Sequence, residues 1–210
     1  MSLLDDFDLF IFDWDGTIST STSIVRATRF FKRRYDTTYI EKHRKDYEVK
    51  DVSNIRIEEE EHMLFSRAYD LYSVFVRPRL KPGAKKVLNM LKRSSKKIAV
   101  FSDAISYRLI KEARMLGLSE LPNTFLSSDS IKRYKPDPTG LLVIADSFRA
   151  KKDRTIYIGD MSSDIMTARF AGVRACAVCD GVQPYEVLSR AKPDYIFQSL
   201  TEMAHAIPSQ

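Results

Sequence analysis

The feature that most constrains this chain is the point where the apolar run 10–12 ends in the motif Asp-Trp-Asp-Gly-Thr at residues 13–17. Alternate residues of a strand point to the same side, so Asp13 and Asp15 should project together from the strand's carboxyl end. Open parallel sheets bind ligands at this end, and two carboxylates there suit a hard divalent cation. Because Asp-x-Asp-Gly also occurs in calcium loops and ordinary turns, the motif alone does not decide between these interpretations.

Apolar runs typical of β-strands recur along the chain, and segments with helical spacing separate the later runs. One such segment carries Ala84, Leu88 and Leu91 on a single helical face. Strands that alternate with helices form a parallel sheet, because each crossover helix packs against the sheet. We therefore predict an α/β fold with a parallel sheet flanked by helices. The predicted strands are residues 8–13, 97–102, 123–127, 155–159, 174–179 and 195–198.

More than eighty residues separate the first predicted strand from the second, which is too many for a single crossover. Most of this excess has helical spacing with polar interruptions, and Pro78 and Pro82 then return the chain to the sheet. We predict that residues 1–17 and 81–210 form one α/β core domain and that residues 18–80 form a small inserted helical domain.

The charge and hydropathy of the chain argue against several partners. Its 34 basic and 28 acidic residues give a formal net charge of +6, but the acids are spread along the chain, so we predict no nucleic-acid partner. The basic cluster that contains Arg26 and Arg29 is typical of a solvated helix face, or alternatively recognises an anionic substrate. No apolar run approaches the ~18 residues of a membrane span, and residues 1–6 have no basic leader. We expect a cytoplasmic protein with no membrane partner, and the sequence does not indicate its oligomeric state.

Polar side chains with possible chemical roles also follow later predicted strands. Ser102 ends one of them, and its hydroxyl and the next backbone amide suit a phosphoryl oxygen, although such a serine is more often a turn or N-cap residue. Lys135 precedes a proline that holds its backbone extended, which gives the side chain a fixed direction, although most lysines are simply solvated. Asp160 and Asp164 follow another strand, but the helix dipole alone also favours an acid in a first helical turn.

All of these side chains lie at, or shortly after, the predicted carboxyl ends of parallel strands. In this order they resemble the four motifs of the haloacid dehalogenase superfamily, and the resemblance covers the sheet domain nearly end to end. It implies a Rossmann-like core, and the position of residues 18–80 directly after the first motif is similar to the helical type 1 cap of that family. The matching motif residues are Asp13, Asp15, Gly16, Thr17, Ser102, Lys135, Asp160 and Asp164.

The resemblance implies a Mg²⁺-dependent phosphatase. Asp13 would attack phosphorus to form an aspartyl-phosphate, and Asp15 would protonate the leaving oxygen and later help to activate water. We expect a raised pKa for Asp15, as a general acid requires, because it lies near other negative charge. The cation would neutralise charge so that a carboxylate can approach a phosphate dianion. The expected Mg²⁺ ligands are Asp13, the Asp15 carbonyl, Asp160 and Asp164.

Further side chains are expected to bind the substrate. Lys135 and Ser102 would hold the transferring oxygens. The Asp103 carboxylate departs from the family pattern, in which a neutral residue is usual, and it would oppose a phosphate unless it points away. The expected substrate-binding residues are Thr17, Arg26, Arg29, Ser102 and Lys135.

The second acid also separates branches of the family. Dehalogenases lack it, because halide departs without a proton, and ATPase-like members have threonine there, so Asp15 favours a phosphorylated substrate. We expect a small phosphorylated metabolite, either phosphoglycolate or a sugar phosphate. Two alternatives stay open: a phosphosugar mutase similar to β-phosphoglucomutase, and a non-catalytic interaction protein that binds acidic partners through its basic cluster.

Overall fold

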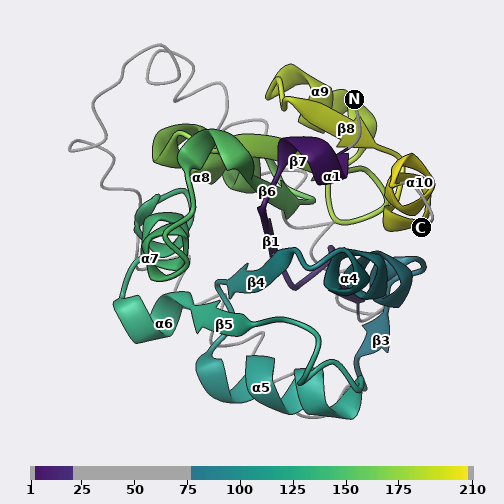
Figure 1. Ribbon diagram of the computed structural model, residues 1–210, viewed down its shortest axis with the longest axis vertical. Coiled ribbons are helices and arrows are strands. Elements are labelled where there is room, and N and C mark those ends of the chain that lie inside the picture. Colours follow the sequence, from purple (N-terminus) through teal and green to yellow (C-terminus); the bar gives the residue numbers. More distant parts are fainter. Residues whose placement is uncertain (1–2, 21–76, 208–210) are drawn as a thin grey trace.

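A computed structural model describes residues 3–20 and 77–207 of the chain. These residues form a six-stranded sheet in the order β5-β4-β1-β6-β7-β8, in which every neighbouring pair is parallel (Figure 1). This confirms the predicted fold class, and each of the six strands of this sheet lies inside one of the predicted runs. The strands are β1 (Leu9–Phe12), β4 (Lys97–Ser102), β5 (Thr124–Ser127), β6 (Thr155–Gly159), β7 (Arg174–Val178) and β8 (Tyr195–Phe197).

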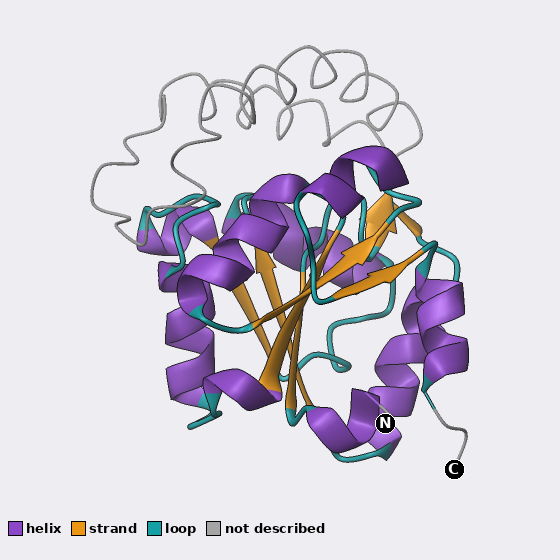
Figure 2. Cartoon of the chain, turned by 90° about the horizontal axis from the view of Figure 1, so that it is seen from above, coloured by secondary structure: helices purple, strands orange, loops and turns teal. Residues whose placement is uncertain are grey.

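Helices cover both faces of the sheet (Figure 2). The helix predicted around Ala84 is present, and it buries Ala84, Val87, Leu88 and Leu91. The helices are α1 (Leu3–Asp6), α4 (Ala84–Arg93), α5 (Ser106–Met115), α6 (Ser128–Ile131), α7 (Thr139–Ser147), the 3₁₀ turn η3 (Lys152–Arg154), α8 (Ser162–Ala171), α9 (Tyr185–Arg190) and α10 (Leu200–Ala206).

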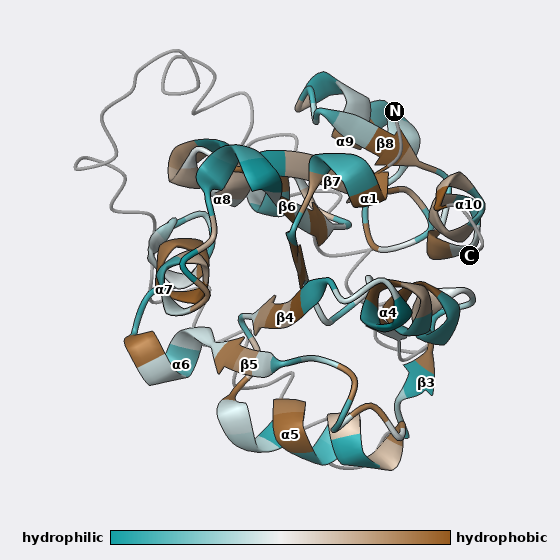
Figure 3. Ribbon diagram, in the orientation of Figure 1, coloured by the Kyte–Doolittle hydropathy of each residue, from teal (hydrophilic) through white to brown (hydrophobic). Residues whose placement is uncertain are grey.

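Alternate residues of the central strand enter two different apolar cores. Phe10 and Phe12 pack in a cluster with residues of α4 and α10, whereas Leu9 and Ile11 pack in a second cluster with residues of α7 and α8. A parallel strand covered on both faces must be apolar at every position, and all four residues of β1 are fully buried. Figure 3 shows β1 in the hydrophobic colour, while the helices carry both colours.

The position of β1 decides where the functional side chains meet. It lies between β4 and β6, and Phe12 pairs with Val100 on one side and with Ile158 on the other. The three strands therefore end side by side, at the place where an open α/β sheet binds ligands. The polar residues that follow these strands leave the sheet at one edge.

A short antiparallel ribbon, β2 (Ser19–Thr20) with β3 (Arg79–Leu80), lies where the chain leaves the sheet domain and returns to it. The Lys81 N–H donates to the Ile18 carbonyl at 2.9 Å, which extends the contact. The predicted inserted domain, with Arg26 and Arg29, lies almost wholly in residues 21–76, outside the described residues. Of the helices in the described ranges, none has the length and apolar character needed to cross a bilayer.

Candidate active site

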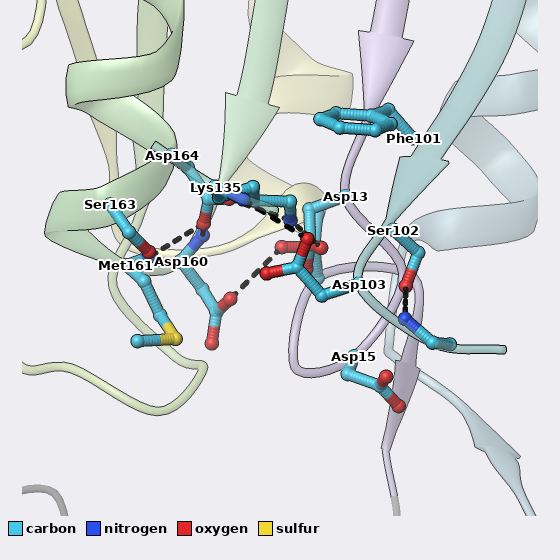
Figure 4. Close-up of polar contacts among 12 residues, drawn as sticks. Asp13, Asp15, Phe101, Ser102, Asp103, Lys135, Asp160, Met161, Ser163 and Asp164 are labelled. Atoms are coloured by element: carbon cyan, nitrogen blue, oxygen red, sulfur yellow. Dashed lines mark hydrogen bonds and ion pairs between the residues drawn. The ribbon is translucent and has the colours of Figure 1, made fainter. Parts of the chain in front are cut away.

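Three buried carboxylates meet at the carboxyl edge of the sheet. Asp13 follows β1, Asp160 follows β6, and Asp164 lies in the first turn of α8. One carboxylate oxygen from each residue lies within 4.8 Å of the others. Figure 4 shows Asp13 and Asp160 at the ends of neighbouring strands, with Asp164 beside them. The fold thus brings together acids that are about 150 residues apart in the sequence.

Lys135 is the cation of this cluster. Its Nζ forms an ion pair with Asp13 and donates to Asp164 Oδ1 at 2.9 Å. Burial lowers the pKa of Lys135, but the charges of Asp13 and Asp164 outweigh it and hold the pKa well above its usual range. Burial raises the pKa of Asp13. The charge of Lys135 opposes this shift, but the negative charges of Asp164 and Asp160 add to it, and the pKa lies well above its usual value. The ammonium group pairs with two of the three carboxylates, and the oxygens of all three suit a hard divalent cation.

The Asp160 carboxylate is enclosed by backbone that only glycine allows. A side chain at Gly16, whose φ is +88°, or at Gly181 would collide with it. The Val182 N–H donates to Asp160 Oδ2 at 2.5 Å, and Thr17 Oγ1 donates to Oδ1 at 3.3 Å. Thr17 is fully buried, so its side chain helps to place Asp160, and a contact between Thr17 and substrate stays a prediction.

Asp164 has a structural role as well as its pair with Lys135. Its Oδ2 accepts the backbone N–H groups of Asp160 at 3.1 Å and Met161 at 3.0 Å, which caps the start of α8. The Tyr157 hydroxyl donates to Oδ1 at 3.2 Å, and burial raises the pKa of this phenol well above its usual value. The sequence does not distinguish Tyr157, because inside an apolar strand it resembles any other core residue.

Ser102 and Asp103 follow β4. Ser102 is buried, and its Oγ accepts the Ala104 N–H at 3.1 Å. Asp103 Oδ1 accepts the backbone N–H of Lys135 at 3.2 Å and the Ser128 hydroxyl at 2.5 Å. This explains the unusual acid at position 103, since its carboxylate fixes the loop that carries Lys135.

Asp15 belongs to a different group of side chains. Its carboxylate pairs with Arg108 of α5: Nη1 donates to Oδ1 at 2.9 Å and Nη2 donates to Oδ2 at 2.5 Å. The Asp15 side chain is 31% exposed, and Figure 4 shows it turned away from Asp13 and Lys135. Its backbone carbonyl stays a predicted metal ligand. Arg108 was not predicted, because nothing in the sequence links α5 to the first motif beyond the helical spacing of Arg108 and Glu112.

Known proteins are similar to this chain in sequence and in fold. The chain is 24% identical to pyrophosphatase PpaX of Halalkalibacterium halodurans over 204 residues, which cover 92% of this chain and 93% of that protein. It is 28% identical to phosphoglycolate phosphatase of Neisseria meningitidis over 144 residues, 67% of this chain and 60% of that protein. A Thermotoga maritima structure described as a β-phosphoglucomutase matches at 18% identity with a TM-score of 0.66, covering 95% and 97% of the two chains.

A sequence model of one family spans most of the chain. The model described as haloacid dehalogenase-like hydrolase matches residues 6–178. This range contains all four motif positions, from Asp13 to Asp164, and the strands β1, β4 and β6 that bring them together. The chain therefore belongs to the haloacid dehalogenase-like hydrolases.

Proposed function

We propose that this hydrolase is a Mg²⁺-dependent phosphatase that acts on a small phosphomonoester through an aspartyl-phosphate at Asp13. One observation carries the proposal: the carboxylates of Asp13, Asp160 and Asp164 lie together at the ligand-binding edge of the sheet, and the Lys135 ammonium group pairs with two of them. A cluster of acids with one cation is suited to a dianionic substrate only if a further cation joins it.

The residues present fit a hard divalent ion. Asp13, Asp160 and Asp164 offer carboxylate oxygens, and the Asp15 carbonyl would complete a set of oxygen donors of the kind that Mg²⁺ prefers. Gly16 keeps the loop close to Asp160, where any larger residue would collide. When bound, the ion would neutralise the negative charge of the phosphoryl group.

The chain's own residues account for the bond changes. An Asp13 oxygen forms a bond to phosphorus while the bond to the leaving oxygen breaks, and Asp15 gives that oxygen a proton. Water then attacks the aspartyl-phosphate and transfers its proton to Asp15, which releases inorganic phosphate and restores Asp13. Two groups would hold the transferring oxygens: the Lys135 ammonium group, and the Ser102 hydroxyl, which the Ala104 N–H fixes in place.

The relatives add one candidate substrate and do not decide among the candidates. Phosphoglycolate and sugar phosphates are the candidates from the sequence, and the similarity to PpaX adds pyrophosphate as a second candidate class. Arg26 and Arg29 stay candidates for the distal anionic group of the substrate. A cytoplasmic location, expected from the sequence, is part of this proposal.

The first experiment measures phosphate release by the purified full chain. With Mg²⁺ it should hydrolyse 4-nitrophenyl phosphate and at least one of phosphoglycolate, pyrophosphate or a hexose phosphate, and EDTA should abolish turnover. Asp13→Asn should be inactive, while Asp146→Asn, at an exposed position on α7, should match the wild type. Equal activity in Asp13→Asn and wild type would remove Asp13 as the nucleophile.

Two further assays address the alternatives. A phosphosugar mutase would isomerise a hexose phosphate in the presence of a sugar bisphosphate faster than it releases phosphate, because an acceptor hydroxyl would outcompete water. A non-catalytic interaction protein would instead bind polyanions in a strongly salt-dependent way and show no turnover.

A further inference from the structure

Helix α5 contacts the loop of the first motif at two points. Arg108 holds both oxygens of Asp15, at 2.9 and 2.5 Å. Glu112, one helical turn later, accepts the indole N–H of Trp14 at 2.7 Å. Trp14 lies between the proposed nucleophile and the proposed general acid in the sequence. Helix α5 is therefore hydrogen-bonded to the residue that connects these two acids.

The two α5 side chains also support each other. Arg108 Nη1 donates to Glu112 Oε1 at 3.3 Å, and both residues are buried. The Trp14 ring is fully buried and packs edge-on against Phe125, with 6.2 Å between ring centroids. A buried ion pair contributes little net stability by itself because desolvation is costly. Stability therefore does not account for the pair between Arg108 and Glu112, and its role lies in the orientation of Asp15 and Trp14.

We propose that Arg108 and Glu112 are positioning residues that fix the Asp15 side chain and its loop relative to the leaving oxygen of the substrate. This inference rests on the proposed function. A partly exposed carboxylate on a loop otherwise samples several rotamers, whereas a fork-to-fork pair with a guanidinium group fixes both of its oxygens. The pair places one N–H group on each oxygen of the Asp15 carboxylate, so the orientation of the whole carboxyl group is set by Arg108.

The chemistry of the leaving group separates this role from a merely structural one. Breaking the phosphorus–oxygen bond of an alkyl ester requires a proton from Asp15, but 4-nitrophenolate departs readily without one. The readout is therefore kcat/KM for glycerol 2-phosphate divided by kcat/KM for 4-nitrophenyl phosphate. A variant that is only partly folded would show an equal decrease of kcat/KM for both substrates, so the ratio would not change. Neither substrate carries a second anionic group that Arg108 could bind directly.

Arg108→Gln should lower this ratio by about 10- to 100-fold, since small misplacements of a catalytic group have effects of that size. Arg108→Lys, which keeps the charge but loses the fork, should fall between Arg108→Gln and wild type. Trp14→Phe should lower the ratio less, because it removes only the donor to Glu112. Arg114→Gln, at an exposed arginine of the same helix, should leave the ratio unchanged.

The double variant Asp15→Asn/Arg108→Gln tests whether Arg108 acts through Asp15. It should show the same ratio as Asp15→Asn alone, because a positioning residue has no effect once its target is gone. An additional loss in the double variant, an unchanged ratio in Arg108→Gln, or a raised one would each overturn the inference. Wild-type turnover that depends on Asp13 and Asp15 would still leave the proposed function intact, whereas a wild type with no turnover would reject the function itself.

Discussion

The two edges of the sheet use the same kinds of ionic side chain in opposite ways. At the carboxyl edge, the side chains of Lys135, Asp13 and Asp164 are at most 6% exposed. Next to the amino ends of β1 and β6, the pair between Asp8 and Arg154 is 56% and 37% exposed. Water screens the exposed pair and limits its contribution to stability, whereas burying several carboxylates together costs free energy.

This difference indicates which edge carries the chemistry. A chain gains little stability by burying three acids around one lysine, so such a cluster is best explained by a bound cation and an anionic substrate. The exposed pair joins the segment before β1 to the 3₁₀ turn η3 before β6, which is a local structural contact. Four changes, from the largest expected effect to the smallest, test this comparison.

Lys135→Met should have the largest effect, because it removes the ammonium group from the buried acids. We expect phosphatase activity to fall by about 1,000-fold. In EDTA the free energy of unfolding should fall by about 3 kcal/mol, since buried charge is left unpaired, and Mg²⁺ should restore part of this loss. Phosphate release and urea unfolding measure the two effects. Lys151→Met, at an exposed position, serves as the control, and equal behaviour of the two variants would contradict the prediction.

Asp160→Asn should remove the response of the protein to Mg²⁺. A divalent ion that binds only the folded state should raise the wild-type melting temperature by about 5 °C at concentrations well above its Kd. The variant loses a ligand charge at the proposed site and should show little or no shift, while EDTA should reverse the wild-type shift. Differential scanning fluorimetry with and without Mg²⁺ measures this, with Asp146→Asn as the matched control. A full Mg²⁺ shift in Asp160→Asn would place the ion elsewhere.

Tyr157→Phe should have a smaller effect. It deletes the hydroxyl that donates to Asp164 and keeps the ring beside Lys135, whose Nζ lies 5.6 Å from the ring centroid. Loss of one buried hydrogen bond should lower the free energy of unfolding by about 1 kcal/mol, with a change in kcat/KM below about 10-fold. Urea unfolding and initial rates measure both quantities. A loss of activity as large as that of Lys135→Met would mean that the phenol takes part in the reaction directly.

Asp8→Asn should have the smallest effect, and this effect should disappear in acid. Hydrogen bonds from Arg154 are the main cause that lowers the pKa of Asp8 from 3.8 to about 2. A lowered folded-state pKa contributes stability above the unfolded pKa, and this stability is lost as the pH falls from about 4 toward 2. Because the pair is exposed, we expect a change in melting temperature of less than about 2 °C near neutral pH. Melting curves of both proteins between pH 2 and 7 should converge at the acid end, and a constant difference throughout would exclude this origin.

The sequence predicted the sheet well because its strands are short apolar runs with clear polar ends. It also selected Asp13, Ser102, Lys135, Asp160 and Asp164 as residues that one edge of the sheet would bring together, since parallel strands end at a common edge. The Asp103 carboxylate departs from the family pattern, but only the structure shows that it accepts the backbone N–H of Lys135.

Other parts of the site could not be predicted in this way. Tyr157 looks like a core residue of a buried strand, and its link to Asp164 exists only because α8 folds back over β6. Arg108 and Glu112 have the i, i+4 spacing of many surface pairs on helices. Only the placement of α5 beside the first motif brings them into contact with Asp15 and Trp14.

The sequence by itself determined the order of strands and helices and the identity of the acids at the strand ends, because hydrophobic periodicity and side-chain chemistry are local properties of a chain. Only the tertiary structure decided which distant side chains share a site and which of the first two acids faces the cluster. Contacts between residues 90 to 150 positions apart depend on how the crossovers stack the strands, and no local pattern records that arrangement.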